Sequence, residues 1–143
     1  MSRGRGFGTE RGTSTLEFIV VLPFLLFIFL VGLELSRAWL TAHIAASAVR
    51  EGARMGAVTP VSPDPPYNMT SWAQTATDRI NDILSAANLT ALGAPTVECT
   101  PTPCAPNSQV DASVTVRFET VVPLFLPQIA RMDITQSASM RYE

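Results

Sequence analysis

The sequence predicts an α+β fold: a long N-terminal helix, a second short helix and a small antiparallel sheet of about three strands. Two patterns carry this prediction. Residues 18–33 form an uninterrupted apolar run without a charged side chain, and residues 110–119 alternate between apolar and polar side chains, as a half-buried strand does. A chain of 143 residues has room for one domain and little more. We therefore expect a leader over residues 1–12, a long helix over 13–58 and a small α+β domain over 59–143.

The leader is short, basic and rich in glycine. Residues 1–12 contain three Arg, one Glu and four Gly. Each Gly costs about 1 kcal/mol relative to Ala in a helix, so we expect this segment to be disordered. Arginines immediately before an apolar run favour an N-terminus in the cytoplasm and a C-terminus on the outer side of the membrane.

The apolar run is long enough for a transmembrane helix. With its flanking leucines it covers residues 16–35, about the 20 residues that cross ~30 Å of hydrocarbon. Pro23 removes one helical hydrogen bond and is expected to bend the helix near its start. Three interpretations compete: a cleavable secretory signal, a simple membrane anchor, and a segment processed at its N-terminal junction. The first is disfavoured, because the nearest A-x-A motif, residues 46–48, lies well beyond the run.

The junction before the run has an unusual carboxylate. Residues 12–18 read GTSTLEF, which places Glu17 and Phe18 at the membrane boundary. A charge there is costly unless it has a partner. A cut between Gly12 and Thr13 would create an ammonium at Thr13, one helical turn from Glu17 or close to the Glu17 of a neighbouring subunit. The two charges would neutralise each other in a low-dielectric helix bundle.

The helix is predicted to continue past the membrane. Residues 36–58 lack proline and are rich in alanine, which favours helix. Small residues recur at spacings of three and four, and this stripe suits either partner helices or the chain's own domain. Trp39 lies where an aromatic belt would sit, and His43 is interpreted as a structural or solvated residue.

The remaining chain is predicted to alternate between loops and short elements. Four prolines between residues 59 and 70 end the long helix. A second helix then extends to about Ala87, with an apolar face formed by Trp72, Ala76, Ile80, Ile83, Leu84 and Ala87. Strands are expected over residues 94–99, 110–119 and 134–142. Residues 121–127 (VVPLFLP) are too rich in proline for a central strand, and are expected to be an apolar connection that covers the core or contacts a partner.

Two cysteines enclose the sequence Thr-Pro-Thr-Pro. A location on the export side favours a disulfide between Cys99 and Cys104. Closing so short a loop contributes only about 2 kcal/mol. The spacing is not Cys-x-x-Cys, so a redox motif is disfavoured.

Composition argues against several classes of function. Ten Arg, no Lys and twelve acids give a net charge of −2, so nucleic-acid binding is not expected. Two Cys and one His do not suffice for a structural zinc site. There is no glycine-rich phosphate loop, so we expect neither an enzyme nor a cofactor, metal or small-molecule substrate.

The junction resembles the type IV pilin-like processing site, in which a prepilin peptidase cuts after Gly and Glu is the fifth mature residue. The Glu17-Phe18 pair resembles the Glu-aromatic form of tight-adherence (Tad, Flp-type) pilus systems. Residues 12–58 resemble the TadE-like family, through the Glu-Phe pair, the apolar run with its proline and the small-residue helix ending in residues 48–54. Residues 137–143 are similar to that family's final strand.

The resemblance implies a minor pseudopilin in the cytoplasmic (inner) membrane, cleaved after Gly12 and used to assemble a Tad-type pilus for adhesion or secretion. Its implied partners are the prepilin peptidase, other pilins or pseudopilins, the Tad membrane assembly machinery and membrane lipid. The mature protein could remain in the membrane or reach the pilus or cell surface. The alternative is an unprocessed single-pass membrane protein that presents an extracytoplasmic interaction domain.

Overall fold

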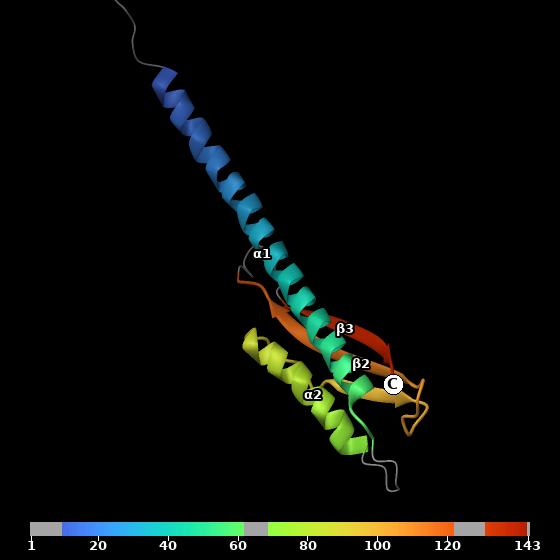
Figure 1. Ribbon diagram of the computed structural model, residues 1–143. Helices are drawn as coiled ribbons and strands as arrows, with labels where there is room; N and C mark the ends of the chain where they lie inside the picture. Colours follow the sequence, from blue (N-terminus) through green and yellow to red (C-terminus); the bar gives the residue numbers. More distant parts are fainter. Residues whose placement is uncertain (1–9, 62–68, 122–130, 143) are drawn as a thin grey trace, which may run out of the picture. The chain divides into compact units, whose positions relative to one another are not determined.

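The computed structural model describes residues 10–61, 69–121 and 131–142, with side chains from Thr15 onward. Its contacts divide the chain into two units, an N-terminal unit that ends at Ser36 and a C-terminal unit that begins at Arg37. The elements (Figure 1) are α1 (Glu10–Val58), α2 (Met69–Ala86), β1 (Thr96–Thr100), β2 (Gln109–Glu119) and β3 (Arg131–Arg141). The predicted α+β class, with one long helix, one short helix and three strands, is confirmed.

Helix α1 begins earlier than the sequence indicated. It starts at Glu10, so the prediction of a disordered segment as far as Gly12 is wrong for its last three residues. Extending an existing helix fixes one residue per hydrogen bond gained, whereas nucleation fixes several, so a long helix can incorporate even a glycine at its end. The helix continues past Pro23 to Val58. The rest of the predicted leader, residues 1–9, lies outside the described residues.

Helix α2 packs through one apolar face, as predicted, and begins at Met69. Its buried side chains recur every four residues: Trp72, Ala76, Ile80 and Leu84. Trp72 anchors the helix to α1, because its indole Nε1 donates a hydrogen bond of 2.8 Å to the Gly56 carbonyl. A buried indole N–H needs such a partner, so this bond fixes both the ring and the approach of the two helices.

The small residues of α1 in the C-terminal unit contact that unit's own core. The buried ones are Ala45, Ala48, Gly52, Ala53, Gly56 and Ala57, together with Val49. At Gly52, a β-carbon would overlap Cγ1 of Ile80 and lie 2.6 Å from its Cδ1. Of the two interpretations of the stripe, packing within the chain's own domain therefore holds for residues 45–57.

The sheet is an antiparallel meander in the order β1-β2-β3. The alternation predicted for β2 is confirmed, since its inward side chains are buried: Val110, Ala112, Val114, Val116 and Phe118. The outward face is rich in hydroxyls, with hydrogen bonds between Thr96 and Ser113 (2.8 Å) and between Thr115 and Thr135 (2.9 Å). β3 begins three residues before its predicted start. The predicted apolar connection lies outside the described residues from Val122 onward.

Helix α1 runs along the core of the C-terminal unit and gives that unit two distinguishable ends. At the entry end, where the chain arrives from Ser36, the Arg37 guanidinium lies 5.5 Å from the centre of the Phe118 ring. At the far end, a β-carbon on Gly56 would lie 3.0 Å from Val110 Cγ1. There too the Val61 amide donates a 3.0 Å hydrogen bond to the Tyr142 hydroxyl. Figure 1 shows α2 and the sheet beside this half of α1.

Candidate functional site

The predicted processing junction lies in the first turns of α1. Gly12 and Thr13 are the third and fourth residues of the helix, and Glu17 and Phe18 follow with exposed side chains. Residues four apart in a helix share a face, so Thr13 and Glu17 are one turn apart on the same side. The first four amides of a helix lack intrahelical acceptors, so the Gly12–Thr13 bond is at the position where opening into an extended chain costs least.

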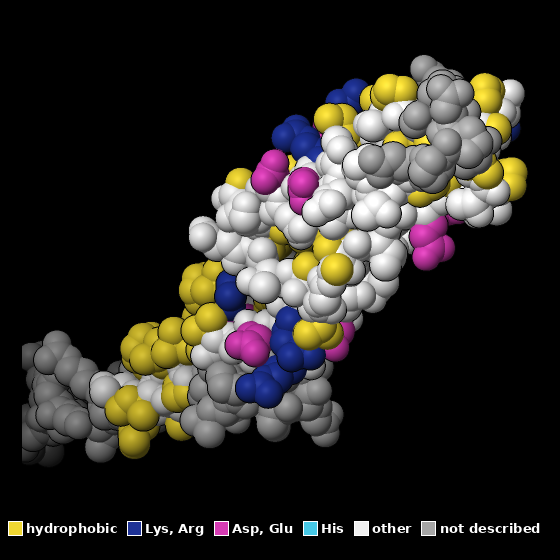
Figure 2. All heavy atoms as spheres, turned by 90° about the horizontal axis from the view of Figure 1, so that it is seen from below, with side chains coloured by type: hydrophobic (Ala, Val, Ile, Leu, Met, Phe, Trp, Pro, Cys, Tyr) yellow, Lys and Arg dark blue, Asp and Glu magenta, His cyan; other side chains and the backbone are white. Residues whose placement is uncertain are grey.

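The apolar segment after this junction is exposed along the described residues of its unit. The most apolar stretch of α1 has none of its residues buried, and it is long and apolar enough to cross a membrane. Its large side chains are exposed, including Val20 at 74% and Leu16 and Phe24 at 67% each. In the space-filling view, hydrophobic side chains lie close together over this part of α1 (Figure 2). Because a water-exposed surface of this kind is unfavourable, the segment requires an apolar environment from outside the unit.

The predicted disulfide is present. Cys99, on β1, is bonded to Cys104, with the two Cα atoms 5.7 Å apart. Cys99 is buried and belongs to the core cluster, and Cys104 packs against it. The bond therefore ties the β1–β2 connection to the core at the far end of the C-terminal unit.

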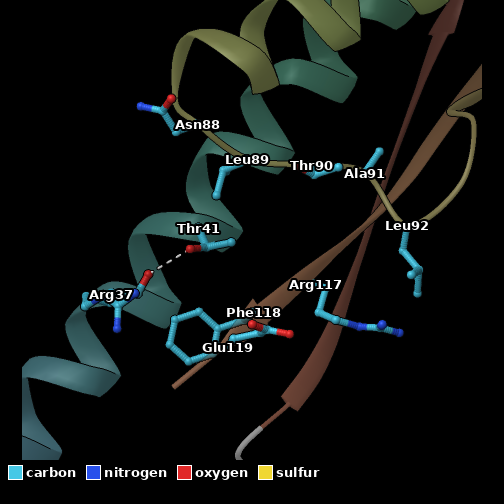
Figure 3. Close-up of a pocket in the computed structure, with 10 residues that line it drawn as sticks. All are labelled: Arg37, Thr41, Asn88, Leu89, Thr90, Ala91, Leu92, Arg117, Phe118 and Glu119. Carbon is cyan, nitrogen blue, oxygen red and sulfur yellow. Dashed lines mark hydrogen bonds between the residues drawn. The ribbon is translucent and has the colours of Figure 1, made fainter. Parts of the chain in front are cut away.

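At the entry end, a cleft of about 470 Å³ opens between α1, the segment after α2 and β2. Figure 3 shows the Phe118 ring turned toward Arg37 and Thr41, whereas the Arg117 side chain points away from α1. Thr41 donates a 3.0 Å hydrogen bond to the Arg37 carbonyl within its own helix. The remaining lining comes from residues 88–92 and Glu119. The cleft thus offers apolar surface beside a guanidinium.

Two exposed ion pairs link β2 to β3. The Arg117 Nε lies 3.0 Å from Asp133 across the β2–β3 ladder, and this hydrogen bond raises the pKa of the guanidinium. Arg131 lies 3.5 Å from Glu119, two residues further along the same two strands. Such exposed pairs contribute little stability but cancel each other's field.

A second ion-pair cluster joins α1 to α2. Arg54 contacts Glu51 at 2.8 Å, and Arg79 of α2 lies 3.6 Å from the same Glu51 oxygen. The hydrogen bond from Arg54 is the main cause of a lowered pKa for the Glu51 carboxyl, and the charges of both arginines add to it although burial opposes the shift.

Several contacts were not foreseen from the sequence. Trp39 and His43 form an edge-to-face pair with ring centres 4.8 Å apart, for which their i, i+4 spacing was a readable signal. The contacts of Arg37 with Phe118 and of Val61 with Tyr142 join residues 81 apart, and no local pattern indicates either. Among the described residues, no three His, Cys, Asp or Glu side chains come together as a metal site would need.

Comparison with known proteins gives a family match to the N-terminal part of the chain. Residues 12–54 match the family model described as TadE-like protein, so the TadE-like resemblance is confirmed over this segment. The match begins at Gly12 and contains Glu17, Phe18 and the whole apolar run. No curated protein and no solved structure matches the chain.

Proposed function

We propose that this chain, TadE-like over residues 12–54, is a membrane-inserted minor pseudopilin that a prepilin peptidase processes after Gly12 and that takes part in assembling a Tad-type pilus. The family match carries the proposal, because it begins at the residue before the proposed cut. The exposed apolar segment supports insertion as a single-pass helix. On this proposal the chain is a structural component and a protease substrate, not an enzyme.

The cut is tested by the mass of the mature N-terminus. In cells with an active prepilin peptidase, mass spectrometry of the membrane-extracted protein should find Thr13 first. Gly12→Val should keep the leader, because a β-branched side chain obstructs an extended cut site. Gly8→Val adds the same side chain upstream of the cut and should be processed normally. An intact leader on the wild-type chain would favour the alternative, an unprocessed single-pass membrane protein with an extracytoplasmic interaction domain.

Glu17 has a proposed role in assembly. Its carboxylate is exposed in the isolated chain, so an isolated chain should tolerate its loss. In a packed helix bundle it would pair with the Thr13 ammonium of its own or a neighbouring chain. Removing one partner of a buried pair costs about 3–5 kcal/mol, because the other charge is left uncompensated.

The matched variants for this role are Glu17→Gln and Glu17→Asp. Both should be inserted and cleaved, and only Glu17→Gln should lose co-purification with other pilus components at equal protein level. Equal co-purification of the two variants would exclude the charge-pair mechanism. Glu34, the carboxylate at the other end of the apolar run, is not a suitable control for Glu17, because Glu34 is only 5% exposed whereas Glu17 is exposed.

Orientation is the remaining part of the proposal. The arginines before the apolar run favour a cytoplasmic N-terminus, and the Cys99–Cys104 disulfide suits an oxidising compartment outside the inner membrane. Protein isolated without reductant should show no thiol that reacts with a maleimide. Reaction at both cysteines would contradict the disulfide and the assigned orientation.

A further inference from the structure

The two edge strands of the sheet, β1 and β3, differ in how far they are protected from further pairing (Figure 1). β1 has five residues, and the chain leaves it through Pro101 and the Cys99–Cys104 disulfide. β3 has eleven residues, contains neither proline nor lysine, and keeps one register with β2 over its whole length. Short strands, proline, lysine and bulges are the usual features that protect an edge. β3 has none of them, so its outer edge is suited to accept another strand.

The hydrogen-bond pattern shows which main-chain groups of β3 face outward. The Tyr142 amide continues the β2–β3 ladder by donating a 2.8 Å hydrogen bond to the Ser108 carbonyl. In an antiparallel ladder alternate residues bond the same neighbour, so the even-numbered residues of β3 bond β2. On the other side of β2 the Thr115 carbonyl accepts from the Leu92 amide, as this alternation requires. The odd-numbered residues of β3 therefore direct their N–H and C=O groups away from β2, and among the described strands β3 pairs with β2 alone.

A groove lies beside this edge, on the face of the sheet that α1 covers. It has a volume of about 330 Å³ and lies between one flank of α1 and β3. It is lined by Trp39, Ala42, His43, Ala46, Ser47 and Arg50 of α1 and by Gln136 of β3. The short side chains of Ala42 and Ala46 leave this flank of α1 open. Alternate side chains of a strand added to β3 would point to the same face, so the groove offers space for them.

Side chains along the edge define the chemistry of the strand that would fit. On the outer face of the sheet, Thr135, Ser137 and Ser139 are exposed and uncharged. Among the described residues Arg141, at the end of β3, has no ion pair. A matching strand therefore has small polar side chains on its outward face and a carboxylate where it passes Arg141. Its inward side chains are apolar, because they enter the groove beside α1.

We propose that the free edge of β3 binds an extended segment of a partner protein, which adds antiparallel as a fourth strand of the sheet. Antiparallel addition is the more stable arrangement and continues the pattern of the three strands. The partner segment alternates apolar and polar residues, and a carboxylate at its start lies opposite Arg141. Recognition of this kind takes its affinity from main-chain hydrogen bonds and its selectivity from alternate side chains. The inference goes beyond pseudopilin processing and insertion and depends on neither.

Hydrogen exchange, measured by NMR on the full chain in detergent micelles, tests the proposal with a synthetic peptide. The probe is the terminally blocked peptide Asp-Val-Thr-Val-Thr-Val-Thr, whose aspartate would lie opposite Arg141 and whose valines would face the groove. Without the peptide, the amides of Thr135, Ser137 and Ser139 should exchange fast, whereas the Ala138 amide is protected by β2. Saturating peptide should slow exchange of the three odd-numbered amides by about tenfold or more.

Two N-methylated peptides separate main-chain pairing from non-specific adhesion. N-methyl groups on the threonines remove the donors that face β3, so this peptide should give no protection. N-methyl groups on the valines point away from β3, so this peptide should protect as the parent peptide does. Absence of protection by the parent peptide, or equal protection by the two methylated peptides, would refute the proposal.

Substitutions in the chain test the same edge. Ser137→Pro removes one outward N–H without removing a β2–β3 hydrogen bond, and an edge strand accepts proline at such a position. This variant should fold and should no longer bind the peptide, whereas Ser137→Ala keeps the N–H and should bind as the wild type does. If Ser137→Pro does not fold, the methylated peptides decide. Binding by a folded Ser137→Pro variant as tight as that of Ser137→Ala would contradict pairing at this edge.

Arg141→Gln tests the carboxylate that the proposal assigns to the partner. This variant should bind the parent peptide about two- to fivefold more weakly, because an exposed ion pair contributes little. A peptide that begins with asparagine should bind wild type and Arg141→Gln equally. An equal loss with both peptides would contradict the assigned contact at Arg141.

Exchange in the free chain identifies the other possible occupants of the edge. Slow exchange of the Thr135, Ser137 and Ser139 amides in dilute chain without peptide would show that the edge is already covered within the chain. Protection that appears only as the chain concentration rises would assign the edge to pairing between copies. Either result would overturn the proposal of a partner strand.

Discussion

The two parts of helix α1 have opposite relations to their surroundings. In the N-terminal unit, large side chains such as Phe24 and Leu25 project outward and none of the most apolar stretch is buried. In the C-terminal unit, small residues such as Ala45, Ala48 and Ala53 are completely buried under α2 and the sheet. Large apolar side chains require an environment from outside the chain, whereas small ones let the chain's own elements approach closely. One uninterrupted helix therefore combines a segment that needs a membrane or partner helices with a segment that organises a core.

The largest expected effect comes from a substitution in the buried core of the C-terminal unit. Trp72 is 2% exposed and donates to the Gly56 carbonyl, so Trp72→Ala should lower the free energy of unfolding of the C-terminal unit by about 3–5 kcal/mol. Trp39→Ala removes the same kind of side chain from a position that is 68% exposed. It should change the free energy of unfolding by about 0.5 kcal/mol or less. Urea titration of the detergent-solubilised chain, followed by circular dichroism, measures both. Equal losses would contradict the assignment of the core.

The elements that the sequence predicted well are those whose pattern is local. The alternation around Val114 defines β2, and the four-residue spacing from Trp72 to Leu84 defines α2. The TadE-like resemblance was readable because Glu17, Phe18 and the apolar run lie close together in the chain, and the family match over residues 12–54 contains them.

What the sequence did not reveal depends on distant contacts. An alanine-rich stripe around Ala45 and Ala53 suits a partner helix and an internal core equally well, and only the placement of α2 and β2 distinguishes the two. Arg37 gave no local sign of its contact with Phe118. The start of α1 at Glu10 was missed because per-residue propensity ignores the low cost of extending a long helix.

Two glycines of α1, one in each unit, allow the two parts of the helix to be compared with the same substitution. A β-carbon at Gly52 would overlap Ile80, whereas one at Gly32 would meet no atom within 4 Å. Gly52→Leu should therefore destabilise the C-terminal unit by about 1–3 kcal/mol through overpacking. Gly32→Leu should cause no loss, because leucine is a better helix former and has open space. Thermal unfolding of both variants in the same detergent measures the two changes in stability. A comparable loss of stability for Gly32→Leu would show that the N-terminal unit also packs against a partner at this position.

The smallest expected effect concerns charged side chains. The apolar segment has none between Phe18 and Leu33, whereas the contact between α1 and α2 contains the ion pairs of Glu51 with Arg54 and Arg79. The hydrogen bond from Arg54, aided by the charges of Arg54 and Arg79, holds the pKa of the Glu51 carboxyl below its ordinary value. A carboxyl whose pKa is lower in the folded than in the unfolded chain binds protons more readily when unfolded. Its stabilising contribution is therefore complete above the unfolded pKa of about 4.3 and is lost as the pH falls through the lowered folded value.

Glu51→Gln removes this contribution and nearly preserves the side chain's shape. We expect the variant to be slightly less stable than the wild type at pH 7, and the difference to shrink steadily as the pH is lowered below about 4. Glu98→Gln, at an exposed position on β1 for which the described residues show no ion pair, is the matched control. Chemical unfolding of the three proteins across this pH range measures the effect. A difference between wild type and Glu51→Gln that is constant with pH would mean that Glu51 stabilises the α1–α2 contact by packing alone, and the ion-pair cluster would then add nothing to the buried side of α1.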